Sequence, residues 1–118
     1  MPKPSSSVAN EVTSRARGLD YSLKRIEQLH RDGQVRVHDV ERAYAGGFLE
    51  FYAYMERSIE RLFLGLLREQ LKSNDPSVHP RIEVHSGAVA MSVVTGERSY
   101  VDWLPYKRYT KKRAKAFF

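Results

Sequence analysis

Two pairs of arginine and histidine have residue types and a spacing that could do chemistry. Four residues separate Arg25 from His30, and six separate Arg31 from His38. An arginine can stabilise the negative charge that develops on a phosphate while a histidine moves the proton of a ribose 2′-hydroxyl, which is the minimum needed to cleave RNA without a metal. Spacing this loose also arises by chance in a chain with 20 basic residues and four histidines. Arg25 and His30 are therefore catalytic candidates, but the spacing alone does not identify an active site.

The places of these residues in the sequence favour structural roles. His30 continues a stripe of apolar residues whose spacing alternates between four and three residues: Val12, Ala16, Leu19, Leu23 and Ile26. Such a stripe indicates a helix, and a histidine at its carboxyl end complements the helix dipole. Arg31 and His38 lie on either side of Gly33, which favours a turn, so we expect both in a loop.

The carboxyl-terminal end of the sequence has an unusual charge. Between Pro105 and Phe118 there is no acidic residue, and six basic residues there equal the net charge of the whole chain, +6. These six are Lys107, Arg108, Lys111, Lys112, Arg113 and Lys115. Tyr106 and Tyr109 alternate with them, a pattern typical of surfaces that stack on single-stranded bases while cations hold phosphates. We predict that the six residues bind nucleic acid; the alternatives are a solvated helix face or a contact for an acidic protein.

Length and composition set the class of protein. The 118 residues, 42% of them hydrophobic and 29% charged, suit one domain, which we expect as a disordered start over 1–7 and a single helical domain over 8–118. Because the chain has no cysteine and its four histidines lack metal-ligand spacing, we expect neither a metal nor another cofactor. No stretch has the character of a secretory signal or a membrane span, which predicts a cytoplasmic protein without membrane contact.

Two long helices are predicted. The first covers roughly 8–31 and ends at Asp32-Gly33, and the second runs from the capping residue Asp39 to near Lys72, before a cluster of turn formers. The apolar stripe of the second helix again has steps of three and four residues: Tyr44, Phe48, Phe51, Met55, Ile59, Leu62 and Leu66. Gly46 and Gly47 lie inside it at a cost of about 1 kcal/mol each relative to alanine. We expect a close helix contact there or, as the alternative, a helix that starts after Gly47.

The polar and aromatic side chains of the second helix divide into two groups. Its acids, Glu50, Glu56 and Glu60, are expected to be solvated or paired across helices. Tyr52 and Tyr54 lie off the apolar stripe, and extra aromatic surface on a long helix is typical of a homodimer interface.

The last part of the chain has a different composition. Segment 81–94 is rich in β-branched residues and predicts a β-hairpin, with a short helix over Gly87 to Val94 as the competing interpretation. Thr110 is expected to cap a third, basic helix, and only about two turns of it precede Phe117-Phe118, which favours a domain that is incomplete at its carboxyl end. The predicted fold class is mainly α: two long antiparallel helices, a short hairpin or helical excursion, and a basic C-terminal helix.

Several segments together resemble the front portion of HEPN-type proteins, specifically small prokaryotic members. They are the helix over 42–56, RAYAGGFLEFYAYME, the connector over 100–106, YVDWLPY, and the basic helix start that follows. The resemblance implies an all-α bundle on two long antiparallel helices, frequent dimerisation and, for many members, RNA binding or cleavage in toxin, defence or CRISPR-linked systems. The Arg-x4-6-His motif of that family lies in a later helix that this sequence does not reach, so no catalytic residue is carried over.

We therefore expect an HEPN-like, RNA-associated module of a prokaryotic defence or toxin-antitoxin-type system without a complete catalytic motif. Its expected partners are RNA and a second copy of the chain or a larger assembly. The alternative is a helical dimerisation or protein-interaction module that another chain completes. A further alternative is a metal-independent ribonuclease that uses Arg25 and His30.

Overall fold

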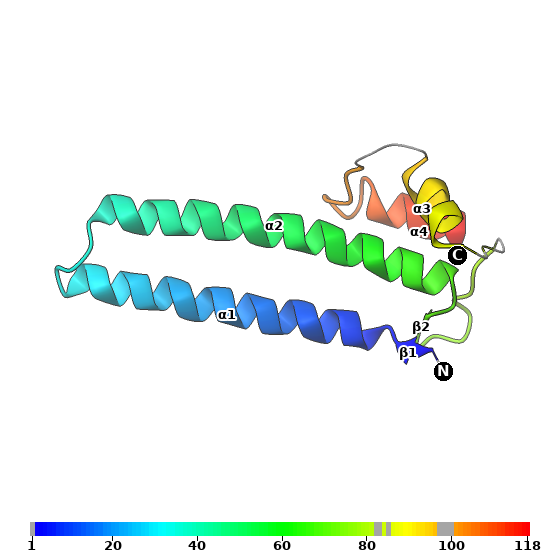
Figure 1. Cartoon of the computed structure of the whole chain (residues 1–118), viewed down its shortest axis with the longest axis horizontal. Coiled ribbons are helices and arrows are strands. Elements are labelled where there is room, and N and C mark those ends of the chain that lie inside the picture. The colour runs from blue at the N-terminus through cyan, green and yellow to red at the C-terminus, as the bar shows by residue number, and fades with distance from the viewer. Residues whose placement is uncertain (1, 82–83, 85, 97–100) are drawn as a thin grey trace. The chain divides into compact units, whose positions relative to one another are not determined.

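The computed structural model describes residues 2–81, 84, 86–96 and 101–118. In chain order, its elements are β1 (Lys3–Pro4), α1 (Ser6–Arg31), α2 (Val37–Leu67), β2 (Leu71–Lys72), α3 (Gly87–Thr95) and α4 (Thr110–Phe117), as labelled in Figure 1. The prediction of a mainly α fold with two long helices is confirmed. The contacts group into two compact units, a hairpin unit, Asn10–Met55, and a terminal unit formed by Met1–Ala9 with Glu56–Phe118.

Within the hairpin unit, α1 and α2 are in close contact at Gly47. A Cβ atom added there would lie 2.6 Å from Cδ1 of Leu19, whereas one added at Gly46 would meet no atom within 4 Å. The predicted close contact is therefore present at Gly47 and absent at Gly46. Because α2 passes through both glycines without a break, the alternative of a helix that starts after Gly47 is wrong.

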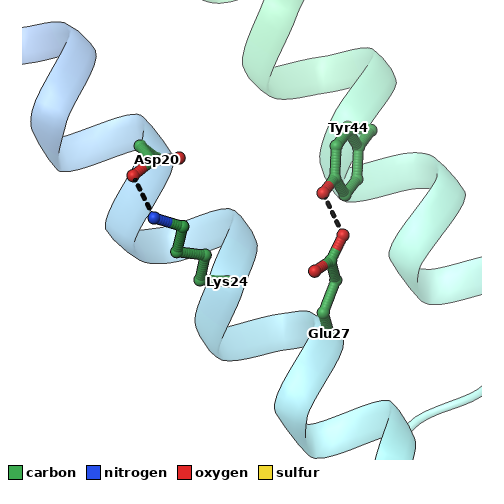
Figure 2. A network of polar contacts seen from close by, with 4 residues as sticks. All are labelled: Asp20, Lys24, Glu27 and Tyr44. Carbon is green, nitrogen blue, oxygen red and sulfur yellow. Dashed lines mark hydrogen bonds and ion pairs between the residues drawn. The ribbon is translucent and has the colours of Figure 1, made fainter.

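A polar network on the same two helices fixes their direction. The Tyr44 hydroxyl on α2 donates to a Glu27 carboxylate oxygen on α1, and an ion pair of 2.9 Å joins Lys24 to Asp20 one turn earlier (Figure 2). Glu27 raises the pKa of Tyr44, chiefly because its carboxylate accepts a hydrogen bond from the protonated phenol and so stabilises that form. Since α1 advances from Leu19 to Glu27 while its partners on α2 go back from Gly47 to Tyr44, the helices are antiparallel.

The first turn of α2 begins two residues before the predicted cap. Val37 is the first helical residue, and the carboxylate of Asp39 in that turn accepts the backbone N–H of Arg36 at 3.0 Å. An acid at this position satisfies a donor that the helix start leaves unpaired and complements the positive end of the dipole. Asp39 therefore caps the helix from inside its first turn.

The end of α2 lies earlier than the sequence indicated, at Leu67 instead of Lys72. Glu69 adopts a left-handed backbone with φ 55°, and two hydrogen bonds close the turn around it: Gln70 N–H to Gly65 O at 2.8 Å and Glu69 N–H to Leu66 O at 3.2 Å. This is the Schellman pattern of a helix end, built without a glycine at the left-handed position. The next residues form β2, whose Leu71 side chain packs over buried Gly65.

The start of the chain pairs with β2. Lys3 lies opposite Leu71 and Pro4 opposite Lys72 in a parallel arrangement, and α1 begins at Ser6. Segment 1–7 was expected to be disordered, and its described residues, 2–7, include this strand and the first helical residues.

Segment 87–95 is the helix α3, so the second strand of the predicted hairpin is wrong and the competing helix is correct. Ser86 caps it, accepting the Val89 N–H at 3.1 Å, and Gly96 ends it with φ 61°. Tertiary packing outweighs the β preference of the valines because Ala90 and Val94 are buried on one face. Residues 82, 83, 85 and 97–100 lie outside the described residues.

An aromatic cluster forms the core of the terminal unit. The buried residues are Phe63, Leu67, Val94, Val101 and Trp103. The Phe63 ring lies with its centroid 4.7 Å from that of Trp103, 6.3 Å from that of Phe117 and 5.6 Å from that of Phe118. Phe117 and Phe118 therefore pack against the core of this unit.

Candidate nucleic-acid interface

Two acids of α2 fix the connector that leads into the basic helix α4. An oxygen of Glu56 accepts the backbone N–H of Trp103 at 2.7 Å and that of Leu104 at 3.4 Å. Glu60, one turn further on, accepts the indole N–H of Trp103 at 3.1 Å. Of the two alternatives expected for Glu56, solvated or paired, the solvated one is wrong, because Glu56 is buried and its carboxylate accepts backbone donors. These bonds set where α4 begins.

Two side chains attach α4 to the connector. The guanidinium of Arg113 lies over the Trp103 ring, 4.5 Å from its centroid, and donates to the Asp102 carbonyl oxygen. The hydroxyl of Thr110 donates to the Trp103 carbonyl oxygen. The prediction that Thr110 caps the helix is wrong, because Thr110 is the first helical residue and the capping position belongs to Tyr109, whose side chain makes no capping hydrogen bond.

The remaining basic residues of this segment belong to α4 or to the turn before it, and together we name them the basic face: Lys107, Arg108, Lys111, Lys112 and Lys115. All five side chains are exposed. At about 100° per helical residue, Lys111, Lys112 and Lys115 fall within an arc of about 100°. Arg113, Ala114 and Phe117 fall on the opposite side of α4, toward the aromatic cluster. Of the six cations predicted to bind nucleic acid, Arg113 is thus occupied with Trp103, and five point outward.

The two tyrosines of the segment differ in their surroundings. Tyr109 has the guanidinium of Arg108 over its ring at 5.3 Å and that of Arg113 at 6.0 Å. Tyr106 is 56% exposed at the start of the basic face. Only Tyr106 therefore presents a largely open ring beside these cations.

The charge of the basic face is not balanced within the described part of the chain. The ion pairs of Lys24 with Asp20 and of His38 with Glu41 both lie in the hairpin unit. No acidic residue occurs from 105 to 118. Five exposed cations in a stretch that contains no acidic residue attract an anionic partner.

The structure does not bring Arg25 and His30 together. Five residues apart on α1, they project in directions about 140° apart around the helix, and both are exposed. His30 instead places its Nδ1 3.0 Å from the Val35 carbonyl oxygen, which joins the end of α1 to the following turn. The expectation of a histidine with a structural partner at a helix end is met.

The second pair is also separated. Arg31 is the last residue of α1, not a loop residue as expected, and its terminal nitrogen donates to the side-chain oxygen of Gln28 at 2.9 Å. His38 lies in the first turn of α2, not in a loop, with Nδ1 3.7 Å from Glu41. Neither arginine–histidine pair therefore forms a joint site in the described structure.

Sequence reasoning missed Glu56 and Glu60 as the anchors of Trp103. The available signal was their spacing of four residues beside the apolar stripe, which places both on one side of α2. That spacing could not show which donors they face, because the donors lie more than 40 positions away.

The described residues contain neither a candidate metal site nor a candidate membrane span. No group of three or more His, Cys, Asp or Glu side chains there is arranged to hold a metal ion. In the same residues, no helix has the length and apolar character needed to cross a membrane. Comparison of the chain with known proteins gave no matching family model, curated protein or solved structure.

Proposed function

We propose that this chain is a cytoplasmic RNA-binding module that holds single-stranded RNA on its basic face. The observation that carries the proposal is the geometry of α4 and of the turn before it: five cations are exposed, while Arg113, Thr110 and Phe117 fix the helix from the inner side. A rigid cationic surface suits a polyanion because each lysine that neutralises a phosphate releases counterions.

Single-stranded RNA is favoured over an acidic protein by the exposed ring of Tyr106 at the edge of the same surface. An aromatic ring beside cations lets a base stack while the adjacent phosphates are held, whereas an acidic peptide makes no use of such stacking. The resemblance to HEPN-type proteins agrees with this partner and adds a prokaryotic defence or toxin-type system as the setting. The proposal concerns binding, because Arg25 and His30 diverge on α1.

The experiment is to replace Lys111, Lys112 and Lys115 together with glutamate and to measure RNA affinity at low salt. A matched control replaces Arg17, Arg25 and Arg42, three exposed cations of the hairpin unit, which changes the net charge by the same amount. Binding that is lost in the lysine variant and retained in the control supports the proposal. Equal losses in both variants would show that net charge, and not this face, determines binding.

A second function, dimerisation through the hairpin unit, is favoured by a separate observation. Leu23 is the only buried residue in Asn10–Met55, a segment that is described throughout. Large apolar side chains on α2 remain exposed, including Phe48 at 57% and Leu49 at 73%, and Tyr52 lies one turn from Phe48. Two helices with so little buried surface are marginal alone, so we propose that a second copy covers this side, on its own or within a larger assembly.

Of the two tyrosines expected at a dimer interface, Tyr52 and Tyr54, only Tyr52 is exposed. Tyr54 is half-buried with the Arg15 guanidinium 4.5 Å from its ring centroid, so its ring is engaged within the hairpin unit. The test is molar mass by light scattering for a Leu49→Glu variant against a Val37→Glu control, which is also exposed and in the same unit. A dimeric mass that falls only for Leu49→Glu supports the proposal, whereas a monomeric unaltered protein contradicts it.

A further inference from the structure

A cavity of about 310 Å³ opens in the terminal unit where α2 ends. Its lining includes apolar walls from Leu66, Leu71, Val78 and Phe118, and polar groups from Glu69, Lys72, Ser73 and His79. The early end of α2 creates it, because the left-handed turn at Glu69 sends the chain back along the helix end as β2. A mostly apolar hollow of this size with a few polar groups is typical of a small-ligand site.

The walls of the cavity are held in place from both sides. The Arg81 N–H donates to the Phe117 carbonyl oxygen at 2.9 Å, which ties the segment after Val78 to the end of α4. Phe118 packs against Phe63 in an edge-to-face arrangement, with ring centroids 5.6 Å apart and an interplanar angle of 70°, which holds the Phe118 ring in place. An aromatic ring fixed in this way presents a firm surface against which a flat group can stack.

The basic face leads to this cavity. Phe118 continues the helical turn, since its N–H donates to the Ala114 carbonyl oxygen at 3.0 Å. Lys111, Lys115 and Phe118 therefore follow one another at intervals of four and three residues, along one side of α4. The row of lysines ends at an aromatic wall, and Lys72 contributes another cation from β2.

We propose that the cavity takes an unstacked base of single-stranded RNA whose neighbouring phosphates lie on Lys111 and Lys115; this inference rests on the proposed function. Phe118 supplies the stacking surface, the aliphatic walls exclude water, and His79 lies where it can hydrogen-bond a base edge. A base bound beside phosphates that are already held adds affinity that phosphate contacts alone do not give.

The experiment compares two oligomers of about ten nucleotides, a single-stranded RNA and its abasic counterpart with the same phosphates. Fluorescence anisotropy gives the affinity of each for the unaltered protein. The same measurement on Val78→Glu and Val89→Glu gives a matched pair, because Val78 lines the cavity at 36% exposure and Val89 lies on α3 outside it at 52% exposure. Circular dichroism confirms that both variants fold.

We expect the unaltered protein to bind the RNA about tenfold more tightly than the abasic oligomer. Val78→Glu should reduce that difference to the part that base stacking on Tyr106 supplies, and Val89→Glu should keep it in full. If RNA and abasic oligomer bind equally, or if both variants keep the full difference, the cavity is not a base site although the basic face still binds phosphates. If the unaltered protein binds neither oligomer, the proposed function fails as well. The comparison of oligomers on the unaltered protein holds even if a variant does not fold.

Discussion

Glu56 on α2 accepts the backbone N–H of Trp103 at 2.7 Å, a contact across 47 positions of the sequence. Glu60 accepts the indole N–H of the same residue, and Arg113 of α4 covers its ring. Trp103 is thus fixed by α2 on one side and by α4 on the other. The orientation of the basic face depends on this single buried tryptophan.

Replacing Glu56 with alanine should reduce the free energy of unfolding by about 1–3 kcal/mol, because the buried N–H of Trp103 loses its acceptor. Glu50→Ala is the control, since Glu50 is an exposed acid of the same helix. Denaturation followed by the fluorescence of Trp103, the only tryptophan, measures both. Equal stability of the two variants would contradict the anchoring role.

Arg113 and Lys112 are adjacent in sequence, but changing them to glutamine should affect different properties: stability for Arg113 and RNA binding for Lys112. Arg113→Gln should lower stability by about 0.5–2 kcal/mol through loss of the contact with Trp103. Lys112→Gln should leave stability within about 0.5 kcal/mol and weaken RNA binding, because its side chain is exposed. Thermal unfolding and RNA titration of both variants check this, and a stability loss for Lys112→Gln would contradict the assignment of the two faces.

Gly65→Ala should destabilise the chain, whereas Gly46→Ala should stabilise it by about 1 kcal/mol. A Cβ at Gly65 would lie 2.5 Å from Cδ1 and 3.3 Å from Cβ of Leu71, so β2 itself would have to shift. At Gly46 the space is open, and alanine is the better helix former. Urea unfolding gives the free energy of unfolding of both variants. Stabilisation by Gly65→Ala would show that Leu71 does not pack over Gly65.

The Tyr44–Glu27 hydrogen bond should make stability depend on pH in alkali. The hydrogen bond raises the pKa of Tyr44 above its ordinary value of 10.0, so its contribution is complete below that pH and is lost as pH rises through the raised pKa. Between pH 8 and 11, Tyr44→Phe should therefore lose less stability than the unaltered chain. Tyr21→Phe, an exposed tyrosine, serves as control and should behave like the unaltered chain. The same loss in all three proteins would argue against the bond.

The long elements were predictable from the sequence because repeated apolar steps over many turns admit only a helix. The end of α2 was not, since it depends on Glu69 adopting a left-handed conformation that its residue type does not indicate. The helix α3 was mistaken for a strand because a run of nine residues is decided by what it packs against.

The candidate site also has one part that the sequence predicts and one part that it does not. The excess of cations from Lys107 to Lys115 can be read directly from the composition of the segment. The distinct role of Arg113 could not, because it depends on α4 starting at Thr110 and on Trp103 lying beneath it.

The most direct test of the basic face is the salt dependence of RNA binding. A plot of the logarithm of affinity against that of salt concentration falls with a slope of about −0.7 for each phosphate neutralised on a single strand. Replacing Lys111, Lys112 and Lys115 with glutamine should reduce the magnitude of that slope by roughly 2. A slope that is the same before and after the replacement would contradict the claim that these lysines hold the RNA.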